Sequence, residues 1–124
     1  MGLNAKQIND LSTGVKLATE LKSSGINLRK FLTILGYIRS ENGKAVTPDK
    51  YLKPDKINSL LFEVRIYELP LEYYTNNWDV TDDDLVNDIY MDDIKGVEKL
   101  ESILNDYITD FSELKPEWLV DTLL

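Results

Sequence analysis

Apolar residues recur at intervals of three and four over much of the chain, which is the spacing of one face of an α-helix. In the N-terminal part this pattern predicts a helix over residues 4–24 that ends at Gly25. A second helix is predicted over about 28–41, with Asn27 as its N-cap. The buried face expected for this second helix consists of Leu28, Phe31, Leu32, Leu35 and Ile38.

Prolines divide the next part of the chain into short segments. One turn of helix is expected at 48–52, with Thr47 as its cap and Pro48 as its first residue. Residues 54–68 have helical spacing, whereas 62–66 also alternate apolar and polar positions as a strand does. We favour the helix, because a strand requires a partner strand and no other segment shows a clear strand pattern.

The acidic stretch 78–93 reads WDVTDDDLVNDIYMDD and combines seven aspartates with apolar residues at helical spacing. No Lys or Arg lies between Arg65 and Lys95 to neutralise these carboxylates. Thr81 is a suitable N-cap, and carboxylates in a first turn are favoured by the helix dipole. The stretch therefore predicts an ordered helix that holds carboxylates in a fixed array.

Two more helices are predicted towards the C-terminus, at approximately 96–111 and 117–124. The complete pattern indicates a mainly α, all-helical protein. We expect a compact single-domain helical bundle of about five to six helices over residues 1–124, with a short β element near 62–66 as the alternative. The short apolar segment 117–124 fits intramolecular packing and a homodimer contact equally well.

The amino-acid composition limits the catalytic and metal-binding chemistry open to the chain. The chain has no cysteine and no histidine, which excludes disulfides, thiolate or imidazole metal sites and the common nucleophile–histidine catalytic arrangements. Asp79 with Asp82, and Glu98 with Glu101, have the i, i+3 spacing of paired magnesium ligands. Asp79 precedes the expected helix cap, however, and no glycine lies among the acidic residues to form a calcium loop. We expect no enzymatic activity, no cofactor and no metal.

The net charge of −8 is unevenly distributed along the chain. The basic N-terminal half, residues 1–62, carries ten Lys or Arg against five acidic residues. The acidic C-terminal half, residues 63–124, carries four against seventeen. Such asymmetry favours attraction between the halves, attraction of a charged partner, or both.

These observations favour a non-enzymatic acidic module that binds a basic protein, such as an inhibitor of a nuclease or another nucleic-acid-binding protein. In this role a nucleic-acid-mimicking carboxylate face occupies a groove meant for phosphates, and aromatic side chains anchor the contact. The expected acidic face consists of Asp82, Asp83, Asp84, Asp88, Asp92 and Asp93. The expected aromatic anchors are Tyr73, Tyr74 and Trp78.

Two alternatives remain open at the level of sequence. The first is a regulatory DNA-binding protein, in which the candidate DNA or anion contacts are Arg29, Lys30, Arg39 and Lys44. The second is an assembly factor of a phage or mobile element. No segment has the length of a membrane span, and residues 1–10 lack the apolar stretch of a signal peptide. We therefore expect a cytoplasmic protein without a membrane partner.

Overall fold

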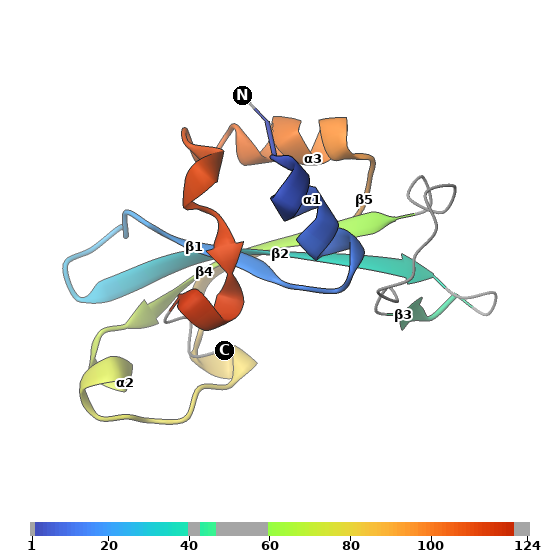
Figure 1. The fold of residues 1–124 in the computed structure, drawn as a ribbon. Helices are drawn as coiled ribbons and strands as arrows, with labels where there is room; N and C mark the ends of the chain where they lie inside the picture. Colours follow the sequence, from blue (N-terminus) through green and yellow to red (C-terminus); the bar gives the residue numbers. More distant parts are fainter. Residues whose placement is uncertain (1, 40–42, 47–59, 121–124) are drawn as a thin grey trace.

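An antiparallel β-sheet is the main element of the protein (Figure 1). The computed structural model describes residues 2–39, 43–46 and 60–120. The strand order across the sheet is β5-β4-β2-β1-β6, and β3 pairs with the end of β2. The strands are β1 (Leu17–Leu21), β2 (Leu28–Arg39), β3 (Ala45–Val46), β4 (Leu61–Pro70), β5 (Val86–Lys95) and β6 (Lys115–Pro116).

Short helices accompany the sheet. In the described ranges the α-helices are α1 (Ala5–Ser12), α2 (Glu72–Thr75) and α3 (Val97–Leu104). Within the same described ranges, single turns of 3-10 helix occur at η2 (Asp82–Asp84), η3 (Phe111–Glu113) and η4 (Glu117–Leu119). The sequence-based expectation of an all-helical bundle is therefore wrong, because most of the described residues in regular structure belong to strands.

The predicted helix over 28–41 is instead β2, the central strand of the sheet. β2 pairs with β4 along ten positions and with β1 along five. Phe31 packs on one side of the sheet and Leu32 on the other, and both are fully buried. A strand covered on both faces has a nearly continuous apolar run, and periodicity alone does not distinguish such a run from a buried helix.

The predicted helix over 4–24 is interrupted in its middle. Asn4 caps α1 with a capping box, in which its side chain accepts from the backbone of Gln7. The helix ends before Gly14, whose φ of 85° is a left-handed conformation that favours glycine. The chain then forms β1, and Gly25 lies in the turn between β1 and β2 rather than at a helix end.

The alternative strand prediction for 62–66 is confirmed, because these residues lie within β4. Its two partner strands are β2 and β5, and both have sequences with helical spacing. The favoured helix over 54–68 is therefore wrong for the part that is described. The predicted turn of helix at 48–52 lies outside the described residues.

The predicted acidic helix is also wrong. The chain forms one turn of 3-10 helix, η2, and then the strand β5. Aspartate and asparagine are poor helix formers, and the open edge of β4 offers this segment backbone hydrogen bonds. Nearer the C-terminus, α3 confirms the core of the helix predicted at 96–111. Of the helix predicted at 117–124, the described part forms only η4.

The sheet has a core on each face. Figure 1 shows α1 and α3 on one side of the sheet and α2 on the other. The larger core lies under α1 and α3 and includes Leu11, Leu32, Ile34, Phe62, Val64, Ile66, Leu100 and Leu104. The smaller core, on the opposite face, consists of Phe31, Tyr67 and Leu69, with Tyr74, Val80, Leu85 and Val120 packed against them.

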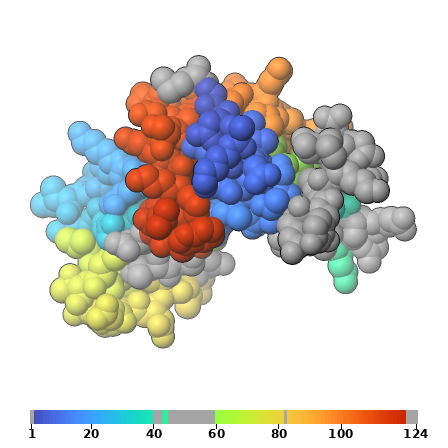
Figure 2. Space-filling model, in the orientation of Figure 1, coloured from blue at the N-terminus to red at the C-terminus, as the bar shows by residue number. Residues whose placement is uncertain are grey.

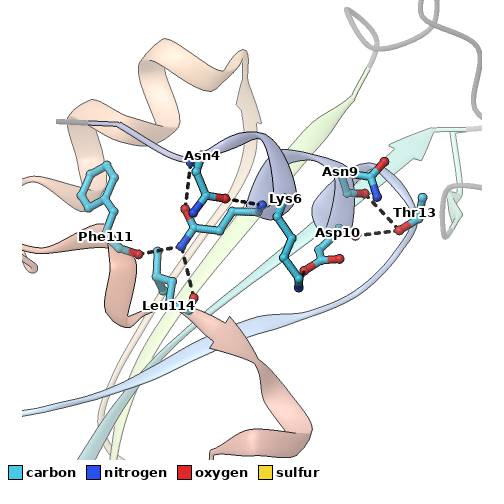
Figure 3. Close-up of polar contacts among 8 residues, drawn as sticks. Asn4, Lys6, Asn9, Asp10, Thr13, Phe111 and Leu114 are labelled. Carbon is cyan, nitrogen blue, oxygen red and sulfur yellow. Dashed lines mark hydrogen bonds and ion pairs between the residues drawn. The ribbon is translucent and has the colours of Figure 1, made fainter.

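A buried glutamine joins the two ends of the chain. The side-chain amide of Gln7 donates hydrogen bonds to the backbone carbonyls of Phe111 and Leu114, at 2.6 and 3.1 Å. Figure 3 shows these contacts beside the cap of α1, and Figure 2 shows the C-terminal segment lying alongside the N-terminal one. Without Gln7, two carbonyls in a buried environment lose their donor.

We expect the substitution Gln7→Ala to lower the free energy of unfolding by about 2 kcal/mol, because it leaves buried carbonyls unpaired and removes half of the capping box. Urea denaturation followed by circular dichroism measures this change. The control is Lys6→Ala on the same helix. The Lys6 side chain is 74% exposed and, among the described residues, pairs with Asp10 alone, so its loss should cost about 0.5 kcal/mol or less. Equal costs for the two variants would contradict the structural role of Gln7.

Candidate functional site

The strand β5 forms one edge of the sheet. It pairs with β4 on one side, and no described strand pairs with its outer side. The register between β4 and β5 shifts twice, between Phe62 and Val64 and between Ile66 and Glu68. On β5, Asn87 and Asp93 adopt a left-handed φ of 53° near these shifts. Between these two residues lies the stretch 88–92, in which Ile89, Tyr90 and Met91 pair with β4 in unbroken register.

Side chains of this edge alternate between the two faces of the sheet. Met91 packs against the larger core, and Ile89 lies beside Ile66 of that core in the strand register. Asp88 and Tyr90 lie on the opposite face. There Asp88 accepts a hydrogen bond from Arg65 of β4, and the Tyr90 hydroxyl donates one to Glu63 of the same strand.

Large apolar side chains on β5 are unusually exposed for a strand. The exposed fractions are 37% for Val86, 42% for Ile89 and 52% for Tyr90. We refer to Val86, Asp88, Ile89, Tyr90 and Asp92 as the β5 surface. Neighbouring apolar groups on an unpaired strand edge are a common feature of interaction sites.

The structure does not bring the six aspartates together on one helical face. Among the described residues, three of them form side-chain contacts. Asp84 accepts from Thr81 and Tyr73, Asp88 pairs with Arg65 at 2.9 Å, and Asp93 contacts Tyr37 and Arg39. Asp83 and Asp92 are exposed and make no hydrogen bond or ion pair with other described residues. The side chain of Asp82 lies outside the described part.

These contacts lower the pKa of each of the three engaged carboxyl groups. The backbone N–H of Thr81 lowers the pKa of Asp84, and the guanidinium of Arg65 lowers that of Asp88. For Asp93, the Tyr37 hydroxyl lowers the pKa first, with a further contribution from Arg39.

The tyrosines near this edge titrate at higher pH than usual. Burial and the hydrogen bond to Asp93 raise the pKa of Tyr37 to about 12. The hydrogen bond to Glu63 raises the pKa of Tyr90. Both hydroxyl groups therefore stay protonated at neutral pH and act as donors to carboxylates rather than as bases.

The three predicted aromatic anchors occupy different environments. Tyr74 packs on Phe31 in the smaller core, below the guanidinium of Arg29. Tyr73 donates to Asp84 and forms an edge-to-face pair with Trp78, with ring centroids 5.3 Å apart. Of the three, only Trp78 is largely exposed, at 48%.

The predicted cationic contacts do not form a common patch. Arg29 donates two hydrogen bonds to Glu20, and Arg39 pairs with Asp93 across the sheet. Lys30 is half-buried near Glu68, whereas Lys44 is exposed. Because acidic neighbours neutralise both arginines, this part of the basic half offers little net positive charge to phosphates.

A cleft of about 540 Å³ lies between β1 and the C-terminal segment. Its charged lining consists of two cations, Arg29 and Lys115, and two carboxylates, Glu20 and Glu113. The balance of charge favours neither a small anion nor a small cation. Across the described ranges, no group of three or more Asp or Glu side chains is placed to hold a metal ion.

Comparison of the chain with protein-family models, curated proteins and solved structures gave no match. Among the described residues, no helix is long and apolar enough to cross a membrane.

The sequence interpretation placed Ile89 and Tyr90 in a helix and did not identify them as exposed side chains of an edge strand. The available signal was their residue type, since β-branched and aromatic residues are enriched in strands. That signal was overridden by the helical spacing of Leu85, Val86, Ile89 and Tyr90.

Proposed function

We propose that this protein is a non-enzymatic binding module whose β5 surface contacts a basic protein. The observation that supports the proposal is the coincidence of three exposed apolar side chains, Val86, Ile89 and Tyr90, with carboxylates on one strand edge that no described strand pairs with. Apolar groups provide the area that association buries, and the carboxylates select a partner of opposite charge.

The charge of the surrounding chain favours the same class of partner. Between residues 79 and 95 the chain carries seven aspartates and a single cation, Lys95. Only two of these aspartates, Asp88 and Asp93, form ion pairs with arginines among the described residues. The remaining negative charge attracts a basic surface at long range and accelerates its association at low ionic strength.

The experiment compares proteins retained from a nuclease-treated cell extract by the immobilised wild type and by the variant Ile89→Ser/Tyr90→Ser. We expect the wild type to retain a basic protein that moderate salt releases, and the variant to lose it. The matched control is Ile26→Ser/Tyr107→Ser, which removes an exposed Ile and an exposed Tyr away from β5. This control should retain the same protein as the wild type.

Thermal denaturation of all three proteins verifies that each is folded. Identical sets of retained proteins for the wild type and the β5 variant would contradict the proposal. Retention of nucleic acid rather than protein, in an extract not treated with nuclease, would favour the DNA-binding alternative.

A further inference from the structure

We infer that β5 binds its partner by strand addition, and that the partner segment is an extended chain in which basic and apolar residues alternate. This inference rests on the proposed function and specifies how the β5 surface recognises its target. It follows from the backbone of the edge, from the alternation of its side chains and from its charge.

The backbone of β5 provides the pairing template. A strand at the edge of a sheet presents alternate N–H and C=O groups outward, and an extended peptide can satisfy them as an added strand. The left-handed residues Asn87 and Asp93 bend the two ends of β5. The added strand therefore pairs mainly with the stretch 88–92 between them, whose centre at Ile89, Tyr90 and Met91 is in unbroken register with β4.

The side chains of this stretch determine the chemistry of the added strand. On one face it has carboxylates at Asp88 and Asp92 on either side of Tyr90, and on the other it has Ile89 and Met91. Residues of an added strand alternate between the same two faces. Cross-strand pairing is favourable when Lys or Arg lies beside the aspartates and β-branched residues lie beside Ile89 and Met91.

A second copy of this chain is a poor occupant of the same edge. In an antiparallel dimer centred on Tyr90, Asp88 of each copy lies opposite Asp92 of the other. Like charges directly opposite each other destabilise strand pairing, so the charge of β5 favours a basic partner over self-association.

The test uses a synthetic peptide of about seven residues in which Lys alternates with Val, a length typical of strands. We expect it to bind the full-length protein and to shift the backbone amide signals of residues 88–92 in NMR spectra. A peptide with Glu in place of Lys should not bind. The variant Asp92→Lys should weaken binding of the Lys peptide about fivefold or more, whereas Asp106→Lys, with the same charge change on the turn after α3, should leave it within about twofold.

Backbone N-methylation of the peptide distinguishes strand addition from contact through side chains alone. One peptide is N-methylated on its Lys residues and another on its Val residues, so that each loses the donors of one edge and keeps every side chain. Only one edge of an added strand faces β5. We expect one of the two peptides to bind about tenfold or more weakly and the other to bind nearly as the unmodified peptide does.

Equal binding of both N-methylated peptides would overturn strand addition. If Asp92→Lys still weakened binding of the Lys peptide in that case, the proposed function would stand without strand addition. Failure of the unmodified Lys peptide to shift residues 88–92 would also overturn the inference. A dimer of the protein in sedimentation experiments, with β5 amides at its interface, would assign the edge to a second copy instead. Loss of the basic protein from Ile89→Ser/Tyr90→Ser tests the proposed function independently of all these results.

Discussion

The variant Gly36→Ala is expected to lower the free energy of unfolding by about 3 kcal/mol and the melting temperature by about 10–15 °C. Gly36 is a buried residue of β2, directly below α1. A Cβ atom added at this position would lie 2.4 Å from the backbone carbonyl oxygen of Leu11. Because that oxygen belongs to the helix backbone and not to a flexible side chain, α1 must move away from the sheet to make room.

The displacement of α1 affects more than one contact. Leu11 is fully buried in the larger core, and Gln7 on the same helix holds the carbonyls of Phe111 and Leu114. Interiors are closely packed, so a shift of the helix opens gaps on one side while it relieves the clash on the other.

Urea denaturation and differential scanning calorimetry measure the effect of Gly36→Ala. The matched control is Gly25→Ala, where an added Cβ would meet only Leu28 Cδ1, at 3.7 Å. Because this is an ordinary contact distance, we expect the control to change stability by less than about 1 kcal/mol, in either direction. A Gly36→Ala variant as stable as the control would contradict the close approach of α1 to β2.

The variant Glu68→Ala is expected to lower the free energy of unfolding by about 2–4 kcal/mol. Glu68 lies in β4 and is only 2% exposed. Its carboxylate accepts from the backbone N–H and hydroxyl of Ser24, in the turn between β1 and β2, and from the side-chain amide of Asn87 in β5. Removal of the carboxylate takes away the acceptor that Ser24 and Asn87 share, and it leaves a gap where the buried side chain of Glu68 packed.

The charge of Glu68 makes its contribution dependent on pH. Burial alone would raise the pKa of Glu68, but the hydrogen bonds from Ser24 and Asn87, with the charge of Lys30, lower it below the ordinary value of 4.5. A carboxyl group whose pKa is lower in the folded protein stabilises the fold above the unfolded pKa. This stabilisation is lost as the pH falls through the folded pKa.

The variant Glu68→Gln isolates the effect of this carboxyl group on the pH dependence of stability, because it preserves the shape of the side chain and removes its titration. We expect the wild type to be more stable than Glu68→Gln at neutral pH, and the difference to shrink as the pH falls below about 4.5. Urea denaturation at a series of pH values measures it. The control Glu72→Gln alters an exposed carboxylate on α2 and should stay within about 0.5 kcal/mol of the wild type throughout. A constant difference between the wild type and Glu68→Gln at all pH values would contradict the lowered pKa.

Part of the fold could be predicted from local signals. Pro70 is the last residue of β4, as expected for a residue that lacks a backbone N–H donor. The apolar stripe of Leu100 and Leu104 correctly indicated the helix α3. The alternation over 62–66 correctly indicated a strand, but it was set aside because no partner strand was recognised. Gly14, whose left-handed conformation follows the end of α1, was an available stop signal that the interpretation passed over.

The candidate site was predicted only as a region of the chain. The excess of carboxylates between residues 79 and 95 is a property of the sequence, and it led to the same class of partner that the exposed edge of β5 supports. The arrangement of those carboxylates was not predictable. Asp88 pairs with an arginine 23 positions away and Asp93 with one 54 positions away, and only the pairing of β2, β4 and β5 brings these residues together.

The sequence by itself determined the charge of the chain and the absence of histidine and cysteine chemistry. Only the tertiary structure decided between helix and strand for residues 28–39 and 86–95. Leu28, Phe31, Leu32, Leu35 and Ile38 satisfy the spacing of a helix face and equally fill both faces of a central strand. Local spacing leaves that choice open, because it depends on the backbone hydrogen bonds that distant strands offer and on the two cores that cover the sheet.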